Sequence, residues 1–270
     1  MKKAEVEGLH LAYYESGTGE PVVFLHGITT SSFIWKNVIP HVNKNYRAIT
    51  VDLLGCGNSD RPHDIDYSLQ NQAYLLRKFI QFLKLEKIHL VGHDIGGGIA
   101  QIFAVRFSDL LYDLVLINPI GYNYWPVQPI STIRTPIIRQ IAMAAFDRGI
   151  LRIIVKRGLF HKNKLTEDLL TDFTNEMNTP SKRKAFLKLA KSLDNKELMV
   201  IKNKLTGLNI PVLIIRGDSD VYLNPIICER LHNDIPGSKY FKINSAGHFI
   251  QIDEPGWLSS QILNFYQNNR

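Results

Sequence analysis

Short apolar runs recur in the first half of the chain and again near its end. Runs of this kind, bounded by polar or glycine-containing segments, are typical of strands buried within a sheet. Residues 5–15 instead alternate between apolar and polar positions, which predicts a hairpin of two edge strands. The apolar runs predict further strands at residues 21–25, 47–51, 88–91, 114–117, 209–215 and 239–243.

Segments with helical periodicity separate these strands. The apolar spacing predicts helices over residues 31–39, 68–83 and 257–266, and a further one directly after Asp94. Alternating strands and helices favour a mostly parallel sheet with right-handed crossovers. We therefore predict an α/β fold, with an eight-stranded, mostly parallel sheet flanked by helices.

The alternation stops between residues 119 and 208, where the pattern is helical and shows no convincing buried strand. We interpret this stretch as a helical cap inserted after the sixth strand. The predicted domains are an α/β core over residues 1–120 and 206–270, and a cap over residues 121–205.

The 270 residues carry a formal net charge of +7. Most of the excess lies in residues 126–205, which hold sixteen Lys or Arg against seven Asp or Glu. This basic segment has few aromatic residues and no recognisable nucleic-acid motif, so we interpret its charges as solvated helix faces. The sequence thus predicts no nucleic-acid partner.

The chain also lacks the marks of a membrane or secreted protein. No apolar segment follows the charged residues at the N-terminus, and no apolar run approaches the roughly 20 residues of a membrane span. Two cysteines, Cys56 and Cys228, suit a reducing compartment and form no metal-binding motif. We expect a cytoplasmic protein with no membrane partner.

The chemistry is centred on the stretch Gly92-His93-Asp94-Ile95-Gly96, which follows an apolar run and precedes a helical one. Glycines lie two residues before and two after Asp94, as they do around the serine of a nucleophile elbow. Such a turn strains its central residue and requires neighbours without side chains. The central residue here is a carboxylate, which needs no proton removal to act as a nucleophile near neutral pH.

These elements, in this order, resemble the α/β-hydrolase fold with a cap domain. Within that fold, the aspartate elbow resembles the group that contains haloalkane dehalogenases, fluoroacetate dehalogenases and epoxide hydrolases. Residues 26–35 look like the HG-x-P-T-S-S-Y-x-W segment of that group, with Thr29 in place of the proline, and residues 52–62 look like its D-x-x-G-x-G-x-S-x-x-P loop. The resemblance implies a hydrolase that forms an alkyl ester on Asp94.

Hydrolysis of such an ester needs a base that activates water and an acid that orients the base. His248, with Gly247 before it and Pro255 after it, resembles the G-H-x-x-x-x-x-x-P segment of the fold. Asp220 matches the family pattern for the acid, and Asp218 remains an alternative that we interpret as a turn residue. The backbone N–H groups of Ile28 and Ile95 are the expected oxyanion donors.

The leaving group is less determined. Haloalkane dehalogenases usually place side-chain donors for the halide at the positions of Ile28 and Ile95, and fluoroacetate dehalogenases place an arginine after the nucleophile. Epoxide hydrolases instead use an acid from the cap. The candidate donors in this sequence are Tyr122, Tyr124, Trp125 and His161.

We expect an epoxide hydrolase-like enzyme that takes a small hydrophobic organic substrate and water, without a metal or other cofactor. A haloalkane dehalogenase-like enzyme is the alternative. A carboxylic-ester hydrolase and a hydrolase-fold protein that only binds a ligand also remain open, as does a homodimer.

Overall fold

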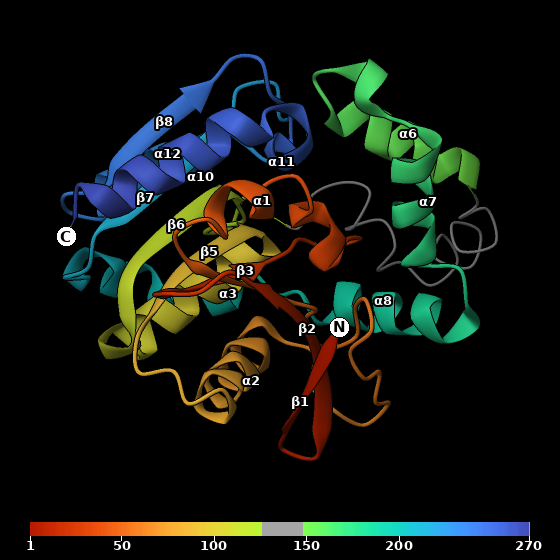
Figure 1. Cartoon of the computed structure of the whole chain (residues 1–270), viewed down its shortest axis with the longest axis horizontal. Helices are drawn as coiled ribbons and strands as arrows, with labels where there is room; N and C mark the ends of the chain where they lie inside the picture. The colour runs from red at the N-terminus through yellow and green to blue at the C-terminus, as the bar shows by residue number, and fades with distance from the viewer. Residues whose placement is uncertain (126–147, 270) are drawn as a thin grey trace.

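The computed structural model describes residues 1–125 and 148–269, and Figure 1 shows their arrangement. Eight strands form one sheet in the order β1-β2-β4-β3-β5-β6-β7-β8. The pairs β1–β2 and β2–β4 are antiparallel, and every other neighbouring pair is parallel. The strands are β1 (Lys2–Val6), β2 (Leu9–Ser16), β3 (Pro21–Leu25), β4 (Arg47–Val51), β5 (Ile88–Asp94), β6 (Leu111–Pro119), β7 (Val212–Gly217) and β8 (Lys239–Ile243).

Helices cover both faces of the sheet because alternate residues of the central strands point to opposite sides. Leu114 and Leu116 of β6 join the core cluster that contains α2 (Leu69–Phe82), α3 (Ile95–Arg106) and α10 (Ile226–Asp234). Val115 and Ile117 join the cluster on the other face. That cluster contains η1 (Ser32–Trp35, a 3-10 helix), α1 (Ile39–Val42), α11 (Ile250–Asp253) and α12 (Pro255–Gln267).

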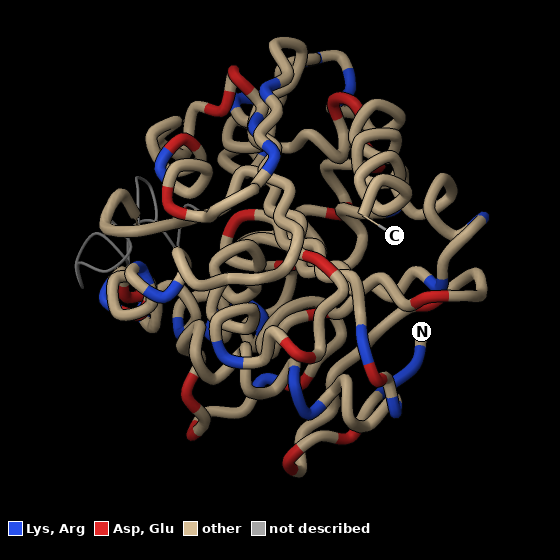
Figure 2. The backbone as a smooth tube through the Cα atoms, turned by 90° about the vertical axis from the view of Figure 1, so that its left-hand side faces the viewer, with Lys and Arg blue, Asp and Glu red and all other residues tan. Residues whose placement is uncertain are grey.

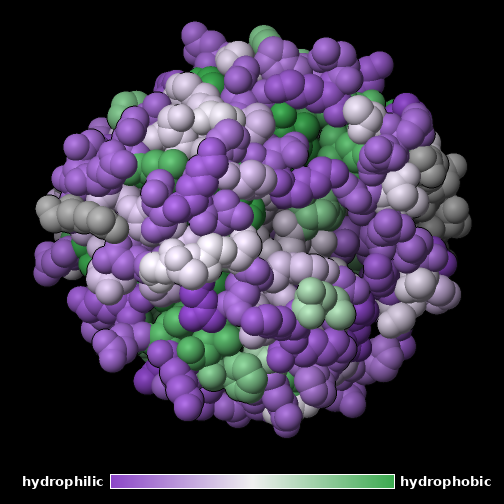
Figure 3. Space-filling model, in the orientation of Figure 1, coloured by the Kyte–Doolittle hydropathy of each residue, from purple (hydrophilic) through white to green (hydrophobic). Residues whose placement is uncertain are grey.

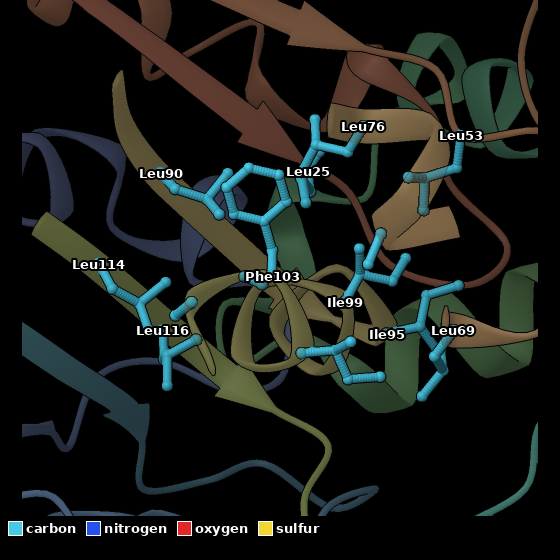
Figure 4. Close-up of a cluster of buried hydrophobic side chains, with 14 of the residues drawn as sticks. Leu25, Leu53, Leu69, Leu76, Leu90, Ile95, Ile99, Phe103, Leu114 and Leu116 are labelled. Atoms are coloured by element: carbon cyan, nitrogen blue, oxygen red, sulfur yellow. The ribbon is translucent and has the colours of Figure 1, made fainter. Parts of the chain in front are cut away.

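Helix α3 packs directly on the middle of the sheet. Figure 4 shows Ile99 and Phe103 of this helix among leucines of β3, β5 and β6. All of its residues from Ile95 to Ala104 are buried. The helix is therefore held between the sheet and α2, and its N-terminus is placed at the carboxyl end of β5.

The N-terminal third differs from the predictions in two places. Strand β2 lies between β1 and β4, so only β1 is an edge strand of the predicted hairpin. The single helix expected over residues 31–39 is instead divided into η1 and α1. Ser32 donates from its backbone N–H to Asp52, and Pro40, near the start of α1, has no N–H with which to continue an earlier helix.

The described residues between β6 and β7 are helical, as the sequence pattern predicts. They form α6 (Arg148–Gly158), η3 (Lys162–Lys164), α7 (Glu167–Asn175), α8 (Pro180–Ser192), α9 (Lys196–Ile201) and η4 (Lys202–Gly207), followed by β7. Helix α9 and η4 pack against α3 of the core. The division at residues 121 and 205 stays a prediction, and residues 126–147 of the expected cap lie outside the described residues. The sequence pattern missed α10, α11 and the 3-10 helix η2 (Ser108–Leu110).

The described surface is mostly polar, and its charges are mixed. Figure 2 shows Lys and Arg positions interspersed with Asp and Glu positions along the chain, and the face in Figure 3 is largely hydrophilic with smaller apolar areas. No helix within residues 1–125 and 148–269 is both long enough and apolar enough to cross a membrane.

Replacement of a buried phenylalanine on α3 tests this packing. We expect Phe103→Ala to lower the free energy of unfolding by about 3–5 kcal/mol, because it leaves a cavity between α3 and the sheet. Urea unfolding measures the change. The matched control is Phe82→Ala on α2, where the side chain is 47% exposed and the expected loss is below about 1 kcal/mol. Similar losses in the two variants would contradict the proposed packing of α3.

Candidate active site

A sharp turn between β5 and α3 presents Asp94 at the end of the sheet. The backbone of Asp94 has φ 54° and ψ −118°, which is unfavourable for a residue with a side chain. A Cβ on Gly92 would lie 2.5 Å from the carbonyl oxygen of Gly96, and a Cβ on Gly96 would lie 2.6 Å from that of His26. Both glycines are therefore required for the turn to close, as its spacing predicts.

The two oxygens of the Asp94 carboxylate have different surroundings. Oδ1 accepts a hydrogen bond of 2.9 Å from the backbone N–H of Ile28, and Oδ2 lies 3.9 Å from Nε2 of His248. Burial raises the pKa of Asp94, while the charge of His248 and the N–H groups of Ile28 and Ile95 oppose this shift. One oxygen thus accepts the N–H of Ile28, and the other faces the imidazole.

His248 is held by a carboxylate on its far side. Its Nδ1 is 2.9 Å from Oδ2 of Asp220, and Oδ1 of Asp220 accepts the N–H groups of Tyr222 and Leu223. Asp218 is exposed, and its backbone N–H donates to Ile243. Asp220, and not Asp218, is therefore the carboxylate that orients the imidazole.

The charges in this group of residues shift one another. Burial by itself would lower the pKa of His248, but the charge and hydrogen bond of Asp220, together with the charge of Asp94, raise it above its ordinary value. Burial would likewise raise the pKa of Asp220, and the charge and hydrogen bond of His248 instead bring it below its usual range. A neutral His248 is consequently populated only above its raised pKa.

The loop after β3 supplies the first backbone donor. Thr29 has φ 66°, which is rare for a β-branched residue, and the hydroxyl of Thr30 closes the loop by donating to the carbonyl of Gly27. The side chain of Ile28 packs against Met177 and Phe186 from the helical segment above it. The side chain of Ile95 lies instead in the core beside Leu69 and Ile99 (Figure 4).

The family follows from a match over most of the chain. The profile of the alpha/beta hydrolase fold family matches residues 20–139 and 143–255. The chain belongs to this family.

Relatives with several activities share the architecture. Haloalkane dehalogenase 2 of Mycobacterium tuberculosis is 26% identical over 93% of this chain and 89% of that protein. The structure of the epoxide hydrolase CorEH superimposes with a TM-score of 0.85 at 21% identity, covering 100% of this chain and 99% of the other. The meta-cleavage product hydrolase CumD superimposes with a TM-score of 0.87 at 22% identity, covering 99% and 98%. Because both structures are less than 25% identical to this chain, their likeness shows only its fold.

Two buried residues that the sequence pattern did not indicate hold the loop that carries the imidazole. Asn118, at the end of β6, donates from Nδ2 to the carbonyl oxygens of Gly247 and His248, and its Oδ1 accepts the N–H of Gly217. His93 donates from Nε2 to the same His248 carbonyl. Burial first, and then the charge of His248, keep the pKa of His93 well below its usual value. A polar residue directly after the apolar run 114–117 was the available signal for Asn118.

Two of the four candidate leaving-group donors have other partners. The hydroxyl of Tyr122 donates to Asp234 on α10, and the guanidinium of Arg230 covers its ring. His161 bonds through Nε2 to Glu254 beside α11. Each of these two side chains therefore already has an acidic hydrogen-bond partner.

The other two candidates, Tyr124 and Trp125, have no acidic partner among the described contacts. Trp125 is 3% exposed, and its Nε1 has no hydrogen-bond partner among the described residues. The ring of Tyr124 is partly buried against the core cluster. An unpaired N–H buried in this way is costly, which makes Trp125 the strongest of the four candidates for contact with a bound molecule.

A cavity of about 640 Å³ lies against strands β2 and β4. Tyr14, Ser16, Ala48 and Thr50 of β2 and β4 contribute to it, and Glu176 lines it from the segment after α7. Asp94, Asp220 and His248 do not line this cavity. Within the described part of the chain, no group of His, Cys, Asp and Glu side chains could hold a metal ion.

Titration of His248 tests the electrostatic coupling without any substrate. We expect Asp220→Asn to lower the pKa of the imidazole, because the largest favourable interaction with the imidazolium is lost while burial remains. NMR titration of the His248 ring measures this change. Asp218→Asn removes a carboxylate two residues away on the same loop, and it should leave the titration unchanged; a lowered pKa in that variant would argue against Asp220 as the partner.

Proposed function

We propose that this member of the hydrolase family is a cofactor-free enzyme that opens a small hydrophobic substrate through an aspartyl-ester intermediate. The observation that supports this proposal is the carboxylate at the elbow, with Oδ1 bonded to the Ile28 N–H and Oδ2 facing His248. A serine at this place would need the imidazole to remove its proton, whereas a carboxylate leaves the imidazole free for water.

In the first step, Oδ2 of Asp94 attacks an electrophilic carbon of the substrate. A bond forms between this oxygen and the carbon, and the bond from that carbon to the leaving atom breaks with its electron pair on the leaving atom. A halide then departs as the anion, whereas an epoxide oxygen stays attached to the substrate and takes a proton from a donor. Oδ1 stays with the N–H of Ile28 and becomes the carbonyl oxygen of the new ester.

In the second step, water attacks Cγ of Asp94 and gives a proton to Nε2 of His248. Negative charge then develops on Oδ1, where the N–H groups of Ile28 and Ile95 stabilise it. Asp220 stabilises the imidazolium that forms. Collapse of this intermediate breaks the bond between Cγ and Oδ2, and the alkoxide takes the proton from His248 and leaves as an alcohol.

The leaving group decides between the two candidate substrate classes. An epoxide oxygen needs a donor that can deliver a proton, and Tyr124 is the described candidate that is not held by an acidic residue. A halide needs only N–H or O–H donors, which favours Trp125 because of its unpaired Nε1. We propose an epoxide as the substrate, because Ile28 and Ile95 provide no side-chain donor for a halide, and a haloalkane as the alternative. Trp125 and Tyr124 are the donors to replace first.

Trapping of the ester tests the mechanism directly. We expect His248→Gln to gain the full mass of an epoxide, or the mass of a haloalkane less HX, when incubated with a panel of both classes, because the ester forms but is not hydrolysed. Mass spectrometry of the intact protein detects the adduct and shows which class reacts. The double variant Asp94→Asn/His248→Gln is the control, and it should gain no mass. Absence of an adduct from every member of both classes would refute the ester mechanism for them.

Isotopic labelling separates this mechanism from direct hydrolysis of a carboxylic ester. During turnover in H₂¹⁸O, the heavy oxygen should enter the carboxylate of Asp94, since Oδ2 leaves with the product. Mass spectrometry of the peptide containing Asp94 measures the incorporation after a single turnover. Direct attack of water on a substrate would leave Asp94 unlabelled, and Asp94→Asn would then keep much of the activity toward aryl esters.

A further inference from the structure

The helical segment between β6 and β7 contacts the loop of the proposed base through one buried carboxylate. Asp253, at the end of α11, is fully buried and accepts three backbone N–H groups at 2.9 Å each. Gly247, one of these donors, precedes His248. The other two, Phe160 and His161, follow helix α6. A single side chain thus joins the base loop to the segment above it, and Figure 1 shows α11 between the rest of the core and that segment.

The two segments also touch through their backbones. The N–H of His248 donates to the carbonyl of Gly158 at 2.7 Å. A Cβ on Gly247 would lie 2.3 Å from that same carbonyl oxygen, and a Cβ on Gly158 would lie 2.7 Å from the ring of Phe249. Approach this close is open only to glycine on both sides, so the position of His248 is fixed partly by residues of the segment above it.

The loop of the proposed acid reaches the same helix. Tyr222 donates from its backbone N–H to Asp220 and from its hydroxyl to the carbonyl of Ile154 in α6. Its ring packs edge-on against His248, with 5.3 Å between ring centroids. The C-terminal half of α6 and the residue that ends it are therefore bonded to both loops that form the histidine–aspartate pair.

The polarity of α6 suits this position. The last carbonyls of a helix lack partners within the helix and carry a partial negative charge. Here the N–H of His248 satisfies the carbonyl of Gly158, so the C-terminal end of α6 lies beside the backbone of His248. The helix end thus places a partial negative charge near the residue that would become positively charged during ester hydrolysis.

From these contacts we infer that Asp253 is a positioning residue for the base. It seats the end of α6 on the base loop and so sets the orientation of His248 toward Asp94. The expected effect on ester hydrolysis rests on the proposed function. The expected effect on the position of the His248 imidazole does not. The end of α6 is in this view a part of the catalytic framework, in addition to any role in covering the substrate.

Glu254 provides a matched control because it is the next residue along the chain. It pairs with the imidazole of His161 across the same boundary, and its side chain is partly exposed. Its carboxylate also bonds the side chain of Ser245 in the base loop, but it accepts no backbone N–H from that loop or from residues 158–161 in any described contact. Removal of the Glu254 carboxylate tests the contact between the end of α11 and the residues after α6 in general. Removal of the Asp253 carboxylate tests the connection to His248.

The experiment compares Asp253→Asn with Glu254→Gln in the full chain. The asparagine amide would direct an N–H toward one of the three donors, so that at least one hydrogen bond is lost. We expect faster exchange of the His248 amide hydrogen and an altered resonance of its Nδ1 proton in Asp253→Asn, and neither change in Glu254→Gln. Hydrogen exchange and NMR measure both without a substrate, and circular dichroism confirms that the variants are folded.

The second readout is kinetic. In Asp253→Asn, breakdown of the Asp94 ester should slow by roughly 10- to 100-fold, while its formation is little changed, so the ester accumulates in the mass spectrum. If no variant forms an ester, the proposed function fails and the His248 signals still decide the role of Asp253. His248 signals in Asp253→Asn that equal those in Glu254→Gln would overturn the inference. Should Asp253→Asn not fold, Tyr222→Phe removes the hydroxyl contact with Ile154 and tests the part of the inference that concerns α6. Unchanged His248 signals in that variant would overturn the assignment of α6 to the catalytic framework.

Discussion

The strained backbone of Asp94 is the constraint on which the site depends. A residue with φ 54° is stable only if the surrounding structure holds it there. The packing of α3 between the sheet and α2 holds the turn in this conformation. Gly92 and Gly96 have no side chains that would clash with the backbone there. The strain places the carboxylate beyond the end of the sheet, within reach of donors from the loop after β3 and of the imidazole from the loop after β8.

Around this carboxylate, the polar groups are arranged by backbone contacts more than by side-chain pairs. Asn118 links the ends of β6 and β7 to the base loop, and Asp253 links the base loop to the residues after α6. Each accepts or donates several hydrogen bonds while fully buried, where an unpaired polar atom is costly. The histidine is consequently held from below, through Asn118 and His93, and from above, through Gly158.

The order of the strands and helices of the α/β core, and the residues of the proposed catalytic group, could largely be predicted from local patterns. The apolar runs at residues 21–25 and 47–51 became β3 and β4, and Ser68 caps α2 at the predicted start. The helix expected over residues 31–39 was wrong as a single element, since its first turn is held by contacts with Asp52, 20 residues away in the chain. Local periodicity contains no information about such a partner.

The sequence by itself predicted the type of chemistry that we propose, because glycine spacing and a carboxylate at the turn are local features. It also indicated a histidine and an acid at the ends of later strands. Only the tertiary structure decided that Asp220 and not Asp218 meets the imidazole, that Tyr122 and His161 have acidic partners of their own, and that Asp253 joins two distant segments. The reason is physical: hydrogen bonds between residues far apart in the chain depend on how strands and helices pack, and that packing leaves no periodic signal in the residues that make the bonds.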